Sequence, residues 1–452
     1  MTILSTSTPT LTLARYAAST SIERLPVEVR ERAQQVIFDE MACAYFGSRS
    51  LAGGLSARYV DSIGGRPEAR ILGTSQRAPA AYAALANGSA GHGDEVDGAH
   101  VVGGHPGATL VHAAVAVAER QRVPGSELIN AVVLGYDIGV RLIAACGGKF
   151  GLKNRLSLHG DFLHAVGASV AASRLLGLDP LRHCHAMVLS TFQANGLEAL
   201  YQEKRHISKS LCNGQYAFAG VSAALMAAAG LEGNEDILGA PHGLLQAWGA
   251  EDRRDELLQG LGENHTIMSA NFKFLNAGYP IHAAVEAALK VVGDHGLQTE
   301  RIESVDIGMP TNTMRVVDNR EMHNICAQDM VTAALVGGGI NLRISPFPVV
   351  LSDPVYRRLR PRVNLRGDAD LDRDQPEGRG AVVTITTTDG GSFSHRVDHP
   401  RGHSLRGGVT WSALAEKWRE GLPECDVDRM IEVSQGLHAL DDVNELVSLF
   451  AV

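Results

Sequence analysis

The segment spanning residues 91–106, GHGDEVDGAHVVGGHP, is the part of this sequence richest in groups that can move protons. It holds two carboxylates, Asp94 and Asp97, and two imidazoles, His100 and His105, within a run interrupted by glycines. Titratable side chains on irregular backbone beside a rigid helix are typical of acid/base sites. The alternative is a solvated loop with inert histidines. We take the segment as the first candidate for a catalytic site.

Asp94 and Asp97 are three residues apart, a spacing that would place them on one face of a helical turn. Two carboxylates held close together raise the pKa of one of them, as a general base requires. A helix cap or contact with solvent is the alternative role for the pair. His105 precedes Pro106, which favours an extended backbone that would fix the direction of the imidazole.

Further candidates lie later in the sequence. His159 comes just before a predicted helix, whose N-terminus could bind an anion. Lys209 precedes an Ala-rich helix and is either a solvated surface charge or a group that holds a substrate carboxylate. Lys273 and His282 bracket an apolar loop, KFLNAGYPIH, in which the lysine either has its pKa lowered by burial or pairs with a carboxylate ligand.

The composition is that of a globular protein: 452 residues, 45% of them hydrophobic and 20% charged, enough for two or three domain-sized units. A net charge of −9 without a basic block argues against nucleic acid or an anionic membrane as partner. Six cysteines without a C-x-x-C pair predict reduced thiols. The sequence has no secretory signal pattern, and its most apolar helices look too short to span a bilayer. We therefore expect a soluble, cytoplasmic protein.

Motifs for bound metals, nucleotides and activated serines are missing from the sequence. It has no H-E-x-x-H, no G-x-G-x-x-G after a strand, no P-loop and no G-x-S-x-G. These observations favour acid/base chemistry without a metal or an organic cofactor.

The hydrophobic pattern predicts which elements position these groups. Before residue 297 it is almost entirely helical, and Gly177 and Gly230 are expected to end two helices in left-handed caps. A strand is predicted at 302–310 and a hairpin at 381–397. We predict a mainly α protein with an α+β insert: a large all-helical domain from residues 1–272 and 401–452, and a smaller α+β lid domain from 273–400. The predicted helices are 26–46, 80–90, 108–120, 126–145, 163–176, 215–229, 328–336, 411–420, 426–434 and 443–450.

In this order, the motifs resemble the MmgE/PrpD family over nearly the whole chain. Known members of that family are 2-methylcitrate dehydratase, cis-aconitate decarboxylase and iminodisuccinate epimerase. The resemblance rests on residues 93–97 with His105 and Pro106, on His159 with 171–179, on Lys209 with Asn213, Gly214 and Gly220, and on 273–282, 287–289, 333–335 and 400–403.

This resemblance implies a helical domain and a smaller lid domain with the site in the cleft between them. It also implies a homodimer without metal or organic cofactor. The family's site positions correspond to Asp94, His105, His159, Lys209 and Lys273, and each keeps the expected residue type.

Two regions depart from the family pattern, D-x-D-D-T in the first motif and a Tyr in the lid domain. Val96 and Gly98 stand where Asp and Thr are common, and Asp329 stands at the Tyr position. A carboxylate there would need a cation such as His323 or Arg320. The substrate would then be neither 2-methylcitrate nor cis-aconitate, but an acid with fewer carboxylates or with an amino or imino nitrogen. The predicted substrate-binding residues are Asp97, His100, His282, Asp329, His323 and Arg320.

The predicted activity is removal of a proton from the carbon next to a carboxylate in a small di- or tricarboxylic acid. Lys209 and Lys273 would stabilise the developing negative charge, and His159 or His105 would carry the proton. Asp94 would act as base or orient a histidine. We rank a hydro-lyase first, an epimerase or isomerase second, a decarboxylase third and a non-catalytic binding protein last.

Overall fold

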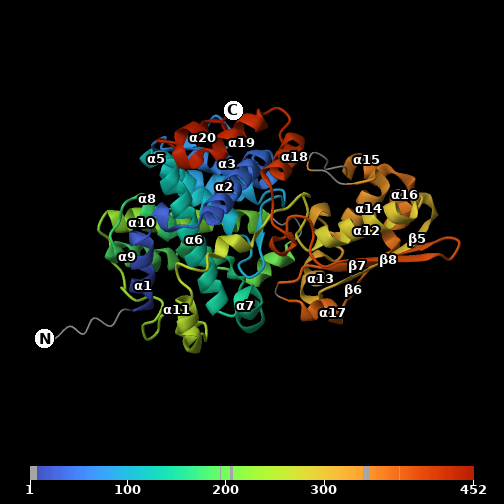
Figure 1. Cartoon of the computed structure of the whole chain (residues 1–452), viewed down its shortest axis with the longest axis horizontal. Coiled ribbons are helices and arrows are strands. Elements are labelled where there is room, and N and C mark those ends of the chain that lie inside the picture. Colours follow the sequence, from blue (N-terminus) through green and yellow to red (C-terminus); the bar gives the residue numbers. More distant parts are fainter. Residues whose placement is uncertain (1–7, 194, 204–206, 340–341, 343–346, 376) are drawn as a thin grey trace.

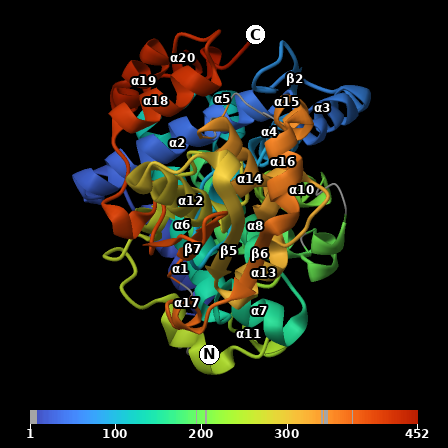
Figure 2. The same cartoon turned by 90° about the vertical axis from the view of Figure 1, so that its right-hand side faces the viewer.

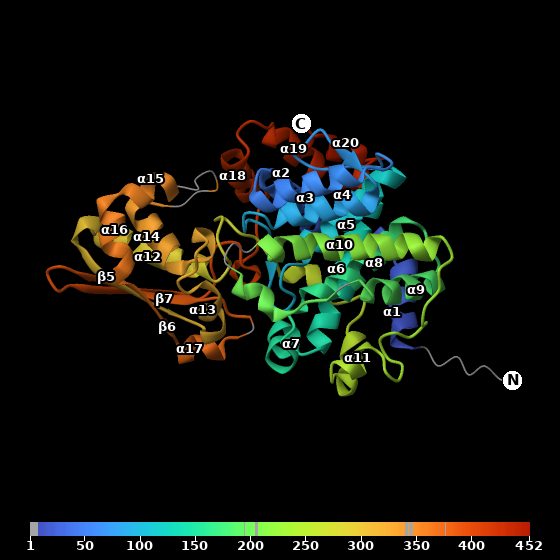
Figure 3. The same ribbon diagram turned by 180° about the vertical axis from the view of Figure 1, so that it is seen from behind.

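The computed structural model describes residues 8–193, 195–203, 207–339, 342, 347–375 and 377–452. A large helical domain and a smaller domain that carries a four-stranded sheet lie side by side (Figure 1, and from behind in Figure 3). This confirms the predicted fold class, which is mainly helical with an α+β part.

The core of the helical domain is a group of tightly packed helices rich in Ala and Gly. These are α2 (Val27–Gly47), α4 (Ala80–Gly91), α5 (Pro106–Gln121), α6 (Gly125–Ala145), α8 (His164–Leu175) and α10 (Ile207–Ala228). The end of the chain returns to this domain, because Phe450 packs against Phe38 of α2 with ring centroids 6.4 Å apart. Its last helices are α18 (Trp411–Gly421), α19 (Val427–Gln435) and α20 (Asn444–Ser448), at the top of Figure 1.

Helix α6 is long and apolar enough to cross a membrane, contrary to the expectation that the most apolar helices are too short. Yet 94% of its most apolar window is buried inside the protein. Burial of this kind is typical of the central helix of a globular core.

The smaller domain is built on one mixed sheet. Its strand order is β6-β5-β7-β8, with β5 and β6 parallel and the other neighbours antiparallel. The helices α12 (Ile281–His295) and α14 (Ala327–Gly337) cover one face of the sheet (Figures 1 and 2). The strands are β5 (Ile302–Met309), β6 (Val363–Gly367), β7 (Ala381–Thr387) and β8 (Ser392–Val397).

The remaining elements are short or peripheral. Two pairs of two-residue strands occur, and of these β3 (Ala99–His100) pairs with β4 (Ala270–Asn271). The others are β1 (Ala69–Arg70), β2 (Arg77–Ala78), α1 (Pro9–Ser19), α3 (Leu51–Ile63), α7 (Gly148–Leu156), α9 (Pro180–Thr191), α11 (Leu244–Ala247), α13 (Thr311–Val317), α15 (Phe347–Ser352), α16 (Pro354–Leu359) and α17 (Ala369–Arg373).

One helix boundary differs from the sequence-based prediction in a way that matters for the site. Helix α10 begins at Ile207 rather than at residue 215, so Lys209 lies in its first turn and not before it. Asn213 and Gly214 are poor helix formers, so the sequence pattern predicted that the helix begins only after them. Tertiary packing overrides that preference, because Gly214 lies directly against Gly88 of α4.

The close approach of α10 to α4 gives a stability prediction. A Cβ on Gly214 would lie 2.1 Å from the Leu85 carbonyl oxygen, so Gly214→Ala should destabilise the fold by about 1–3 kcal/mol. Gly293→Ala in α12 is the matched control, since its Cβ would meet nothing within 4 Å and should stabilise by about 0.5–1 kcal/mol. Urea unfolding of both variants measures the difference, and equal midpoints would contradict the packing described.

Candidate active site

A cavity of about 120 Å³ lies where the two domains meet. The helical domain contributes His105, His159 and Lys209, three of the five predicted catalytic residues. The smaller domain contributes Tyr279, Pro280, Asn312, Thr313, Val316, Val317, Ile325 and Arg379. The cavity therefore occupies the cleft position that the family resemblance implied.

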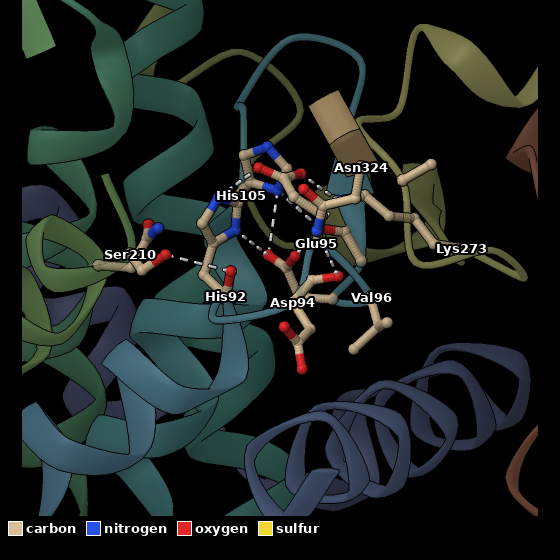
Figure 4. A network of polar contacts seen from close by, with 12 residues as sticks. His92, Asp94, Glu95, Val96, His105, Ser210, Lys273 and Asn324 are labelled. Atoms are coloured by element: carbon tan, nitrogen blue, oxygen red, sulfur yellow. Dashed lines mark hydrogen bonds and ion pairs between the residues drawn. The ribbon is translucent and has the colours of Figure 1, made fainter. Parts of the chain in front are cut away.

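Asp97 orients two imidazoles at the wall of this cavity. Its Oδ2 accepts hydrogen bonds from His92 Nδ1 at 2.8 Å and from His105 Nδ1 at 3.1 Å. His105 Nδ1 also donates to the Gly98 carbonyl oxygen at 3.0 Å. Asp97 and His92 are fully buried, whereas the His105 side chain is 14% exposed. Figure 4 shows these rings converging.

Lys209 lies on the other side of the same rings. Its Nζ is 2.6 Å from His92 Nε2 and 3.3 Å from His105 Nε2. The Nδ1–H of His105 is directed at two oxygen acceptors, so its Nε2 carries the lone pair that accepts from Lys209. Burial and the Lys209 charge lower the pKa of His105 to about 4. His105 is therefore a neutral base at the cavity wall.

Lys273 forms ion pairs with the buried carboxylates of Glu95 and Asp97. Its Nζ lies 2.9 Å from Glu95 Oε2 and 3.3 Å from Asp97 Oδ1. Burial opposes the charge, but Asp97 and Glu95 raise the pKa of Lys273, so it pairs with carboxylates of the protein itself. The short pairing of β3 with β4 holds Lys273 there, two residues beyond Asn271. Lys273 is fully buried and is not among the residues that line the cavity.

His92 and Glu95 also belong to this network, although neither was predicted from the sequence as a site residue. Glu95 lines the cavity, and its Oε1 is 3.1 Å from His92 Nε2 and 3.4 Å from Lys209 Nζ. Its backbone is left-handed, with φ of 57°, which is uncommon outside glycine. This conformation is not visible in sequence, so spacing alone could not identify which acidic side chain points inward.

Asp94 does not join the network. The segment is not helical there, and the Asp94 carboxylate bonds no described residue and does not line the cavity. Burial raises the pKa of Asp94 to about 6. The direction agrees with the expectation, but its cause is burial and not the neighbouring carboxylate of Asp97. A catalytic role for Asp94 stays a prediction.

His159 is a second neutral imidazole at the cavity. The Tyr216 hydroxyl donates to the Asn195 carbonyl oxygen at 2.7 Å, so its oxygen accepts from His159 Nε2 at 3.1 Å. The proton of the neutral ring therefore sits on Nε2, and Nδ1 is the basic nitrogen. Burial lowers the pKa of His159 as well.

Two of the predicted substrate-binding histidines, His100 and His282, form hydrogen bonds with the backbone. His100 Nδ1 accepts from the Val102 and Gly103 amides, and its Nε2 donates to the Thr266 carbonyl oxygen at 3.0 Å. His282 donates to the Ala277 carbonyl oxygen at 3.1 Å. Neither imidazole lines the cavity.

Asp329 has its cation partners, but one of them differs from the prediction. It bonds His323 Nδ1 and Arg360 Nε, both at 2.6 Å. Arg320 instead donates to the Glu203 carbonyl oxygen at 3.0 Å. Asp329, His323 and Arg320 are not among the cavity-lining residues, so their contact with substrate stays a prediction.

His92, Asp97 and His105 also place three possible metal-ligand atoms within 4.8 Å of one another. Each donor is already engaged, because Asp97 accepts both Nδ1–H groups and pairs with Lys273. A divalent cation would displace these protons and lie beside the ammonium groups of Lys209 and Lys273. The arrangement fits an ion-paired network better than a metal centre.

The different surroundings of Asp97 and Asp94 give a second prediction. Asp97→Asn should destabilise the protein by about 3–5 kcal/mol and lower turnover, because it leaves buried charges unbalanced and both imidazoles without their acceptor.

Asp94→Asn should instead raise the unfolding free energy at pH 7, since the folded protein disfavours the Asp94 carboxylate. That gain is present above pH 6 and should vanish as the pH falls below about 4, where Asp94 is protonated in both states. The unfolding free energies of both variants, measured from pH 4 to 8, test this. An equal loss of stability in Asp94→Asn and Asp97→Asn would contradict the network.

Comparison with known proteins identifies the family. The MmgE/PrpD N-terminal domain matches residues 11–256, and the MmgE/PrpD C-terminal domain matches residues 276–434. The chain is 24% identical to a cis-aconitate decarboxylase of Aspergillus terreus, over 97% of this chain and 94% of the relative. It is 23% identical to human cis-aconitate decarboxylase, over 95% and 91%, and 24% identical to the cis-aconitate decarboxylase-like protein oryM of Aspergillus oryzae, over 98% and 97%. The chain belongs to the MmgE/PrpD family.

Proposed function

We propose that this chain is a hydro-lyase that removes a proton from the carbon next to a carboxylate in a small di- or tricarboxylic acid. One observation carries the proposal: two neutral imidazoles and a lysine ammonium line a single cavity between the domains. Such a set can take a proton from carbon and stabilise the negative charge that follows. Membership in a family of enzymes that process carboxylic acids supports it.

In the proposed reaction, a substrate carboxylate lies against Lys209, which stabilises the enolate that forms. His105 Nε2 takes the α-proton, and Asp97 stabilises the resulting imidazolium through Nδ1, as a carboxylate does for a catalytic histidine. His159 Nδ1 accepts a hydrogen bond from the substrate hydroxyl. The imidazolium then returns its proton to the departing hydroxide, so that the products are an alkene and water.

Decarboxylation is the second candidate, because the named relatives are cis-aconitate decarboxylases. The same base and ammonium would serve loss of carbon dioxide instead of water. Asp329 gives no reason to exclude this reaction, since it is paired with Arg360 and does not line the cavity. Return of the proton to the opposite face would make the enzyme an epimerase.

Proton NMR in deuterium oxide tests these reactions with one panel of hydroxy-, amino- and unsaturated di- and tricarboxylates. A new alkene, or hydration of an existing one, is expected for the hydro-lyase. Loss of a carbon as carbon dioxide would point to the decarboxylase, and deuterium at an α-carbon with an unchanged skeleton would point to the epimerase. No reaction of folded protein with any acid would contradict the proposal.

His159→Ala should remain folded and lose about 100-fold in turnover, because the departing hydroxyl is no longer held in position. Tyr216→Phe is a milder change for comparison, because it keeps the His159 imidazole. It removes only the Tyr216 hydroxyl that accepts a hydrogen bond from His159 Nε2. Steady-state kinetics and thermal unfolding of both variants measure this. Retained turnover in the His159 variant would remove it from the mechanism.

The pH dependence distinguishes His105 from Asp94 as the base. A base must be unprotonated, so kcat/KM should fall on the acid side near pH 4 if His105 acts, and near pH 6 if Asp94 acts. Dividing out the titration of the substrate isolates the enzyme group. An acid limb near pH 6 that disappears in Asp94→Asn would contradict the assignment to His105.

The family resemblance supports a further proposal, a homodimer without metal or organic cofactor. The cysteine pattern of the sequence supports another, a cytoplasmic location. Light scattering on the purified protein measures the oligomeric state, and a monomer at micromolar concentration would overturn the dimer.

A further inference from the structure

A second set of polar groups lines the same cavity and plays no part in the proton transfer described above. Lys149 lies in the first turn of α7, and Arg379 immediately precedes the segment that leads into β7. Both cations lie over the ring of Phe150, with Lys149 Nζ 5.2 Å and Arg379 Cζ 5.9 Å from its centroid. All three residues line the cavity. Two cations from different domains therefore meet at one aromatic ring.

The Asp161 carboxylate lines the same cavity and acts on Lys149. Among the residues that the structure describes, Lys149 forms no ion pair, whereas Lys153, one turn further along α7, pairs with Glu198 at 3.0 Å. Burial and the charge of Arg379 lower the pKa of Lys149 well below its ordinary value, although the Asp161 carboxylate opposes this shift. The fold thus holds two like charges close together, an arrangement that a bound anion would stabilise.

Arg379 is fixed in place by the backbone. It is 2% exposed, and its guanidinium donates to the Val101 carbonyl oxygen of the helical domain at 3.0 Å and to the Gly378 carbonyl oxygen at 2.7 Å. These contacts hold a rigid cation across the domain boundary at the cavity wall. A preorganised guanidinium suits a carboxylate ligand.

Tyr279 supplies a third donor. Its side chain lines the cavity and is 6% exposed, and its buried hydroxyl has no hydrogen-bond partner among the described residues. A buried hydroxyl without a partner is rare, because an unmade hydrogen bond costs about 1–3 kcal/mol. The charge of Arg379 acts on this hydroxyl, which places the two groups near each other.

We propose that Lys149, Arg379 and Tyr279 form a second anion subsite that binds a carboxylate of the substrate other than the one next to the reacting carbon. This proposal rests on the proposed function, which defines the ligand as the substrate, but the subsite itself can be tested by binding alone. It assigns the enzyme to acids with at least two carboxylates. A monocarboxylate would bring no second carboxylate to this subsite.

Calorimetry with unreactive probes tests the subsite directly. The probes are malonate, succinate and glutarate, each compared with its half-amide, which keeps the length and loses one charge. Wild-type protein should bind at least one diacid about 10- to 100-fold more tightly than the half-amide, the range for a charge-assisted hydrogen bond. Lys149→Gln should abolish that preference, and Tyr279→Phe should reduce it.

Lys153→Gln is the matched control, since it removes the same charge from the same helix and cavity but from a lysine that is already paired. It should keep the preference for the diacid. The proposal is overturned if wild-type protein shows no preference, if Lys149→Gln retains it, or if both lysine variants lose it equally. Failure of the proposed function would appear separately, as no turnover in the NMR panel despite diacid binding.

Discussion

The carboxylate of Asp97 is the group on which the rest of the site depends. It accepts hydrogen bonds from two imidazoles and pairs with Lys273, all within the protein interior. A buried charge is tolerated only when it is paired and hydrogen-bonded. The carboxylates of Glu95 and Asp97 pair with the ammonium groups of Lys209 and Lys273. Burial and the Lys209 charge leave His105 neutral at the cavity wall.

The fold brings these groups together from distant parts of the chain. His92 caps the end of α4, Lys209 lies in the first turn of α10, and Lys273 follows the short strand β4. The C-terminal helix α18 also contributes, because Lys417 pairs with Asp39 at 2.7 Å and donates to the Val96 carbonyl oxygen at 3.3 Å. A helical domain built partly from the end of the chain therefore fixes the loop that carries the acidic groups.

Periodicity predicted the long helices and the hairpin because their patterns are local. The residues that make up the site were harder to predict from the sequence. His105, His159 and Lys209 could be identified from motifs, but Glu95 is turned inward by a left-handed backbone that no spacing rule shows. Lys149 and Arg379 lie far apart in the sequence and meet only across the domain boundary, so no local pattern predicts that they come together.

The most direct test of the account is nitrogen NMR of the histidine side chains at pH 7, with His105 and His159 assigned by single replacements. The account predicts two neutral rings, with the proton on Nδ1 in His105 and on Nε2 in His159. Spectra in which both nitrogens of His105 carry protons at pH 7 would contradict its role as the base, and with it the proposed chemistry.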